Sequence, residues 1–129
     1  MKVYKLERHG RLFMLKAFIE GQEGKAFPKL LLDTGSAYTI ISQEILENIG
    51  CSPPTLARKR QRIITGSGYE IAPLISLSKF HCFGKVVNDF EVLAHTLPFG
   101  TYVDGLLGMD FLKLFEIETK ISTGEILIR

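Results

Sequence analysis

The sequence predicts a mainly β domain with two short helices. Uninterrupted apolar runs are all short, and most are bounded by Gly, Pro, Ser or Asn, as in strands that are joined by turns. No internal repeat or low-complexity linker interrupts this pattern. The chain has 129 residues, of which 46% are hydrophobic and 23% charged. This length and composition are typical of a buried core, so residues 1–129 are expected to form one globular domain.

The expected elements follow from turn residues and from runs rich in Leu, Ile, Val and Phe. Strands are expected, in chain order, at residues 11–19, 25–32, 38–41, 63–65, 69–71, 74–83, 85–94, 105–108, 115–119 and 125–128. Helices are expected at about residues 43–48 and 109–114.

Each turn and helix end has its own signal. Residues 21–24 join the first two strands into a hairpin, Gly84 joins the two longest strands, and residues 122–124 form the last turn. Ser42 suits the N-cap of the first helix, because its hydroxyl can accept a backbone N–H. Gly50 suits the end of that helix.

Composition excludes several functional classes. Sixteen Lys and Arg residues against fourteen Asp and Glu residues give a net charge of +2, too small for a dedicated nucleic-acid or membrane-surface protein. Cys51 and Cys82 are expected to be free thiols, since two cysteines support neither a disulfide framework nor a zinc site. His9, His81 and His95 are scattered and are interpreted as ordinary imidazoles. Neither a metal nor another cofactor is expected.

The hydropathy pattern contains no membrane signal. No apolar run approaches the roughly 18 residues that a membrane span needs. Residues 1–9 lack the apolar stretch of a signal peptide. A soluble, cytoplasmic protein without a membrane partner is therefore expected.

A basic run precedes the strand expected at residues 63–65. It consists of Arg58, Lys59, Arg60 and Arg62. Such a run can bind nucleic acid, but this one has no interleaved aromatic residue on which bases could stack. A solvated face is the favoured interpretation, and nucleic-acid binding is kept only as a minor alternative.

The tetrapeptide Asp33-Thr34-Gly35-Ser36 is the most informative site. Three leucines at residues 30–32 lead directly into it. An ionisable group is thereby placed at the end of a buried strand, beside a glycine turn. In isolation, such a motif is also typical of an ordinary turn in which the Asp side chain caps the backbone.

Two features downstream favour a chemical role over an ordinary turn. Residues 105–108, Gly-Leu-Leu-Gly, form a second apolar strand end before a helix start. Between the two motifs lies a hairpin whose tip is Gly66, Ser67 and Gly68. The motifs are about 70 residues apart, and the three features in this order are more specific than any one alone.

In this order the motifs resemble the retropepsin family, the single-domain aspartic proteases of retroviruses and their bacterial and eukaryotic relatives. Residues 31–36 resemble the catalytic motif, residues 106–112 the second signature, and residues 64–71 the flap. The resemblance implies a retropepsin-like acid-protease half-barrel that acts as a homodimer. It also implies an aspartic endopeptidase that hydrolyses extended, apolar-flanked segments of a peptide or protein substrate.

The resemblance assigns a role to each site residue. Asp33 would be catalytic, and its loop would be supported by Thr34, Gly35 and Ser36. Substrate would be bound by Leu31, Leu106, Gly66, Ser67 and Gly68. Hydrolysis by this route uses two carboxylates that share a proton, one to activate water and one to protonate the scissile carbonyl. Because the chain has one such motif and is too short for two lobes, a second Asp33 is expected from another copy in a C2 homodimer.

The sequence departs from the viral pattern at positions that carry an ion pair there. Ala37, Tyr38 and Met109 stand where retroviral enzymes commonly carry acidic residues and an Arg. Both partners are absent together, so no unpaired charge remains, and other contacts must hold a dimer. The alternative is a catalytically silent retropepsin-like module for dimerisation or peptide binding, because fold alone does not settle function. The intact Asp33 motif and flap favour the enzyme.

Overall fold

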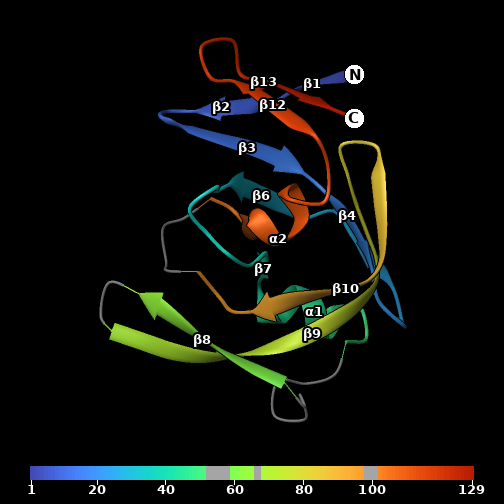
Figure 1. Cartoon of the computed structure of the whole chain (residues 1–129). Coiled ribbons are helices and arrows are strands. Elements are labelled where there is room, and N and C mark those ends of the chain that lie inside the picture. The colour runs from blue at the N-terminus through green and yellow to red at the C-terminus, as the bar shows by residue number, and fades with distance from the viewer. Residues whose placement is uncertain (52–58, 66–67, 98–101) are drawn as a thin grey trace.

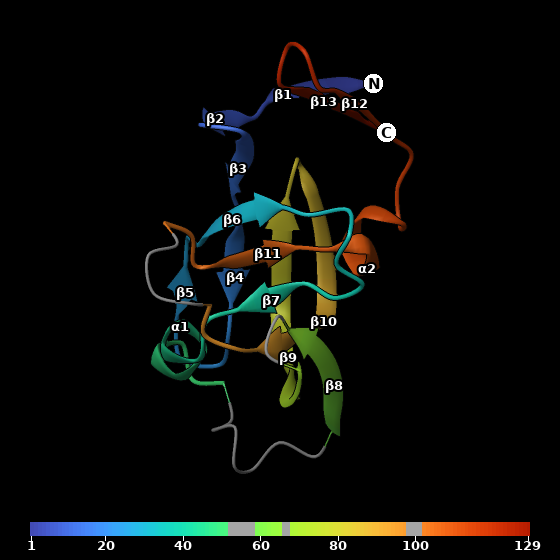
Figure 2. The ribbon, with the colours of Figure 1, turned by 90° about the vertical axis from the view of Figure 1, so that its left-hand side faces the viewer.

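Two β-sheets and two short helices form the part of the chain that the computed structural model describes, residues 1–51, 59–65, 68–97 and 102–129 (Figure 1). The smaller sheet has the antiparallel order β1 (Lys2–Lys5), β13 (Glu125–Ile128), β12 (Ile117–Lys120). It brings the two ends of the chain side by side at one end of the molecule (Figures 1 and 2).

The larger sheet contains the sequence motifs. Its strands have the order β2-β3-β6-β11-β7-β10-β9-β4-β5, and β8 pairs with β9. Their bounds are β2 (Glu7–His9), β3 (Leu12–Lys16), β4 (Phe18–Glu20), β5 (Lys25–Ala26), β6 (Lys29–Leu32), β7 (Ile40–Ile41), β8 (Lys59–Thr65), β9 (Gly68–Cys82), β10 (Lys85–Ala94) and β11 (Gly105–Leu107). The helices are α1 (Gln43–Asn48) and α2 (Met109–Leu112).

Three short strands at the centre of the larger sheet bring the two motifs together (Figure 2). Strand β11 pairs in parallel with β6 and antiparallel with β7. A Cβ at Gly105 would overlap the Ile40 carbonyl, and a Cβ at Gly108 would overlap the Tyr38 carbonyl. Both positions therefore require glycine, because the backbones approach too closely for any side chain.

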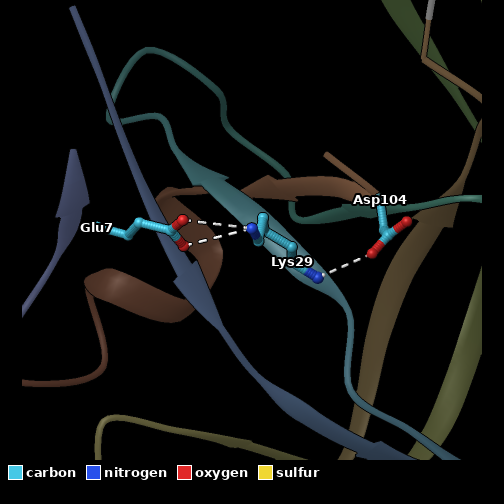
Figure 3. Close-up of polar contacts among 3 residues, drawn as sticks. All are labelled: Glu7, Lys29 and Asp104. Atoms are coloured by element: carbon cyan, nitrogen blue, oxygen red, sulfur yellow. Dashed lines mark hydrogen bonds and ion pairs between the residues drawn. The ribbon is translucent and has the colours of Figure 1, made fainter. Parts of the chain in front are cut away.

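Asp104 fixes the start of this central unit (Figure 3). Its carboxylate Oδ2 accepts the Lys29 N–H at 2.9 Å, and its own N–H donates to the Lys29 carbonyl at 2.7 Å. The Ser42 N–H donates to the Asp104 carbonyl at 2.9 Å, which ties the start of α1 to the same point. The Lys29 ammonium lies 3.4 Å from the Glu7 carboxylate, an exposed pair that contributes little stability.

Aromatic rings connect α2 to the long strands. Phe80 of β9, Phe90 of β10 and Phe111 of α2 have ring centroids 5.0, 5.2 and 6.2 Å apart. Phe80 and Phe111 are fully buried. Tilted and edge-to-face pairs of this kind add about 0.5–1.5 kcal/mol each beyond the burial of their area. The cluster holds α2, and with it the second motif, against the sheet.

The first predicted helix is confirmed in both bounds. The Ser42 hydroxyl oxygen accepts the Ile45 N–H at 3.4 Å, and Gly50 follows the helix with φ of 81°. Helix α2 ends at Leu112, whereas the sequence predicted 109–114. It ends early because the Leu114 N–H donates to the Phe111 carbonyl at 3.1 Å, which closes a tighter turn than an α-helix.

Strand β9 runs through Pro73, where the sequence predicted a break between two strands. Pro73 lies opposite Arg60 of β8, and the ladder to β10 begins only at Leu74. Because β9 has a neighbour on one side only at this point, the missing N–H of proline interrupts no second ladder. Strand β8 likewise begins at Lys59 rather than at Ile63, so the described part of the basic run lies within a strand.

The predicted first hairpin is formed, but as two strand pairs. Met14 lies opposite Leu31 in the β3–β6 pair, and Ile19 opposite Ala26 in the β4–β5 pair. The strands part around Pro28, which has no N–H to donate, although its carbonyl still accepts the Ala17 N–H at 3.1 Å. Strands β1 and β2 were not predicted. For β1 the reason is that its hydrogen-bond partner, β13, lies at the other end of the chain.

Replacing Gly105 with Ala should destabilise the protein, because the new Cβ would overlap the Ile40 carbonyl between two central strands. We expect the free energy of unfolding in urea to fall by about 2 kcal/mol or more. Gly24→Ala is the matched control, since a Cβ there would make only ordinary contacts of 3.7 Å or longer. Equal stability of the two variants would contradict the packing argument.

Candidate active site

Asp33 directly follows β6 and is fixed by backbone contacts on both sides. Its N–H donates to the Leu107 carbonyl at 3.1 Å, and its carbonyl accepts the Ser36 N–H at 3.1 Å. The Gly35 N–H donates to the carboxylate Oδ1 at 3.0 Å. These bonds form a tight loop that presents a half-buried carboxylate at the end of the central strands.

The rest of the loop is more open. Thr34 and Gly35 are exposed, and the Ser36 hydroxyl donates to the Tyr38 carbonyl at 2.7 Å. A Cβ at Gly35 would come within 3.2 Å of the Asp33 Oδ1, so a larger residue would crowd the carboxylate. Within the described part of the chain, no hydrogen bond holds the Thr34 side chain.

A buried network joins the first motif to the second. The Thr39 side chain is fully buried. Its N–H and hydroxyl donate to the two oxygens of Asp110 at 2.8 and 2.7 Å, and its hydroxyl oxygen accepts the Gly108 N–H at 3.1 Å. The Met109 N–H in turn donates to the Ser36 carbonyl at 2.8 Å. Asp110 thus positions the loop that contains Asp33.

An open cleft of about 610 Å³ lies over this loop. Asp33, Gly35 and Ser36 line it on the side of the first motif. The rest of the lining comes from the segment after that motif, from β7, β8 and β11, and from the end of β10 with the residues that follow it. These residues are Ala37, Tyr38, Ile40, Gln61, Arg62, Ile63, Leu93, His95, Leu97 and Leu106. Most of these side chains are apolar, so the cleft suits an extended chain with apolar residues.

The predicted substrate residues are only partly brought together. Leu106 lines the cleft, whereas Leu31, its neighbour in the parallel ladder, is half-buried and does not. Gly68 starts β9 opposite Thr65 with φ of 128°, which suits glycine, and it lies outside the cleft lining. Gly66 and Ser67 lie outside the described residues.

Sequence reasoning missed four residues of this region. The sequence indicates Thr39 and Asp110 only weakly. Thr39 is a polar residue in an apolar strand and Asp110 is an acid shortly after Gly108, and each needs a hydrogen-bond partner if it is buried. Arg62 is exposed, in line with the predicted solvated face, but it also lines the cleft. His95 had no signal at all, because only the fold brings it to the cleft that Asp33 lines.

Other reactive groups do not add to this site. Both cysteines are free thiols, as predicted, and burial raises the pKa of Cys51 and that of Cys82, the latter to about 12 from 9.0, so Cys82 stays protonated. Among the described residues, no group of three His, Cys, Asp or Glu side chains could hold a metal ion. None of the helices that the structure describes has the length and apolar character needed to cross a membrane.

Comparison with protein families identifies the chain. The family described as "gag-polyprotein putative aspartyl protease" matches residues 17–114. The chain belongs to this family. The matched part of the chain contains both Asp33 and the second motif, and the resemblance predicted from those motifs is confirmed.

Solved structures show the same fold for this aspartyl protease family member. A retropepsin-like aspartic protease from Rickettsia conorii is 19% identical and superposes with a TM-score of 0.73, over 98% of this chain and 89% of that chain. EIAV protease in complex with the inhibitor HBY-793 is 17% identical, with a TM-score of 0.57 over 85% of this chain and 90% of that chain. No curated protein sequence matches. The predicted mainly β, retropepsin-like fold with two short helices is therefore confirmed.

Replacing Thr39 with Val should test the network between the motifs. Valine keeps the shape but removes one of the two bonds to Asp110 Oδ1, which still accepts the Phe111 N–H, and it leaves the buried Gly108 N–H without its partner. We expect the free energy of unfolding to fall by about 2 kcal/mol in urea denaturation. Thr119→Val on β12 is the control and should change stability by less than about 0.5 kcal/mol. A variant as stable as the parent protein would show that the network is dispensable.

Proposed function

We propose that the chain is an aspartic endopeptidase that hydrolyses extended, apolar-flanked peptide segments. The observation that carries the proposal is the Asp33 carboxylate, held by the Gly35 N–H and lining an open, mostly apolar cleft. Family membership and the fold support it, since both are those of aspartic proteases.

The proposed reaction uses two Asp33 carboxylates, one from each copy of the chain. One is ionised and takes a proton from water, which attacks the scissile carbonyl, while the protonated one donates to the carbonyl oxygen. A single chain supplies one carboxylate at this site, so the proposed active site is complete only in a C2 homodimer. The exposure of Thr34 and Gly35 supports this arrangement, because the loop is open to a second copy.

Positioning is the main contribution of the surrounding residues. The Gly35 N–H orients one carboxylate oxygen, and the Asp110 network keeps the loop in place without touching the substrate. We assign the apolar subsite to Leu106 together with Ile40, which lines the cleft beside it. We assign Leu31, one strand further, to the part of the site that a second copy would complete.

The hairpin of β8 and β9 is the proposed flap. Gln61, Arg62 and Ile63 of β8 line the cleft, so this hairpin borders a bound peptide. A strand with a free edge can pair with an extended peptide by backbone hydrogen bonds, and closure over the peptide would exclude water from the carboxylates. Gly68 contributes the backbone freedom that such a movement needs.

Replacing Asp33 with Asn should abolish peptide cleavage without unfolding the protein. The amide keeps the shape of the carboxylate but cannot act as a base, so we expect turnover to fall by about 10²–10⁴-fold at an unchanged melting temperature. The assay is incubation with a mixed peptide library at several pH values. Asp89→Asn, at an exposed position of β10, is the matched control and should keep full activity. Near-normal cleavage by folded Asp33→Asn protein would contradict the two-carboxylate mechanism. Absence of cleavage by the parent protein would favour the catalytically silent binding module.

Mixing the parent protein with Asp33→Asn protein should test the shared site. If each site needs two Asp33 residues, an equal mixture in exchange equilibrium forms active pairs in only about a quarter of dimers. The cleavage rate at constant total protein should fall to that fraction, whereas independent sites would give one half. Mixing with Asp89→Asn protein should leave the rate unchanged. Activity proportional to the parent fraction would contradict a dyad across two chains.

A further inference from the structure

Two side-chain contacts join the hairpin of β8 and β9 to the body of the molecule, one from each strand. On β8, Gln61 Oε1 accepts the Tyr38 hydroxyl at 3.1 Å. On β9, Glu70 Oε2 lies 3.4 Å from His95 Nε2. We propose that these contacts, the β8 clasp and the β9 clasp, hold the hairpin over the cleft and set how often it lifts to admit a peptide. This inference rests on the proposed function and concerns how the same site opens.

The hairpin has little backbone attachment to the body beside the cleft. It lies at the end of the molecule opposite the small sheet (Figure 1). Within the described residues, positions 68–73 of β9 pair with β8 alone, because the ladder to β10 begins at Leu74. Hydrogen bonds between β8 and β9 hold the two strands to each other and not to the body. The position of the hairpin over the cleft therefore depends on side-chain contacts.

Strand alternation places both clasps on the face of the hairpin that is turned toward the body. Gln61 lies opposite Ala72 in the register. Ile63 lies opposite Glu70, so these four side chains share one face. Ala72 is 2% exposed and packs against buried residues of β7 and β10, whereas the Tyr69 ring on the other face is 62% exposed. The inner face thus combines apolar packing with two polar contacts.

The β8 clasp is fixed at both of its ends. The Ser36 hydroxyl donates to the Tyr38 carbonyl at 2.7 Å, which ties Tyr38 to the loop of Asp33. Gln61 Nε2 donates to the Arg62 carbonyl at 3.2 Å, and this holds the amide with its oxygen toward the Tyr38 hydroxyl. A single hydrogen bond between part-buried neutral groups contributes a small free energy, which changes the population of a lifted hairpin only a few-fold.

The β9 clasp joins the hairpin to the segment after β10. The His95 backbone N–H donates to the Ile41 carbonyl at 3.1 Å, which fixes this end of the clasp to β7. The contact with Glu70 becomes an ion pair when the imidazole is protonated. The two side chains are 24% and 50% exposed, so the pair is also weak. Two weak contacts suit a lid, because each can break and re-form rapidly.

The clasps and the cleft coexist in the structure. The cleft has its volume of about 610 Å³ while both contacts are formed, so the clasped hairpin leaves room for a peptide beneath it. Lifting the hairpin breaks both contacts at once, because they lie on the two strands of one hydrogen-bonded unit. Their effects on opening should therefore multiply, which two unrelated contacts on separately moving segments would not require.

The experiment measures how often the hairpin lifts, with the thiol introduced by Ala72→Cys as the probe. This position is buried against the body, so the thiol reacts in proportion to the lifted population. Its reaction with a pyridyl disulfide is followed by mass spectrometry at about pH 5, where imidazoles are usually protonated. We expect Tyr38→Phe and Glu70→Met each to raise the rate about threefold, and both together about tenfold. Adding His95→Gln to Glu70→Met should have no further effect, since both remove the same contact.

The native cysteines are internal controls for this rate. Cys82 is buried in the main core and reacts only on wider unfolding, and Cys51 lies outside the hairpin. Neither rate should change. Tyr102→Phe and Glu118→Met are the matched controls, because they make the same changes at exposed positions outside the hairpin. They should leave the rate of the introduced thiol unchanged.

Several results would overturn the inference. They are parental rates in Tyr38→Phe and Glu70→Met, equal effects in the matched controls, an equal rise at Cys82, or a combined variant no faster than its single changes. An extended peptide with an apolar pair should also leave Asp33→Asn protein faster by the same factors when the clasps are removed, and unchanged release would refute the role of the hairpin as a lid. If the parent protein neither binds nor cleaves peptides while the thiol rates follow expectation, proteolysis is refuted and the clasps stand.

Discussion

The close approach of β7 and β11 is the constraint on which the site depends. Only glycine fits at Gly105 and Gly108, because the carbonyls of Ile40 and Tyr38 occupy the space of any side chain. This contact brings the segment after the first motif against the second motif. It also places the Leu107 carbonyl where it can accept the Asp33 N–H. A single backbone packing requirement therefore determines where the carboxylate lies.

The Thr39 and Asp110 network makes that arrangement rigid. Hydrogen bonds to a carboxylate are stronger than bonds between neutral groups, and in a partly buried place an unmade bond is costly. Asp110 accepts bonds from Thr39 and from the Phe111 N–H at the start of α2. Because α2 is itself fixed by the phenylalanine cluster, this network connects the loop of Asp33 to the core through α2.

Local signals in the sequence were sufficient for local structure. Ser42 and Gly50 define α1 through cap chemistry that acts within one turn, and the Asp33 motif predicts the family and an ionisable group at the end of a buried strand. Pairings between distant segments had no such signal, as for β1, which pairs with the far end of the chain. The same limit explains why Arg62 and His95, 33 positions apart, could not be assigned to one cleft. Leu31 stays a prediction, since the cleft of a single chain does not include it and its matching position in the motif concerns a site formed by two copies.

The proposed dimer and the proposed chemistry impose the same electrostatic requirement. Two carboxylates brought together at the dimer axis repel each other unless they share a proton, so the protonation state that favours association is also the one that catalysis uses. This chain lacks the ion pair that Ala37 and Met109 replace, so it has less charge attraction to offset that repulsion. Binding of a peptide that contacts both copies would then stabilise the dimer by mass action.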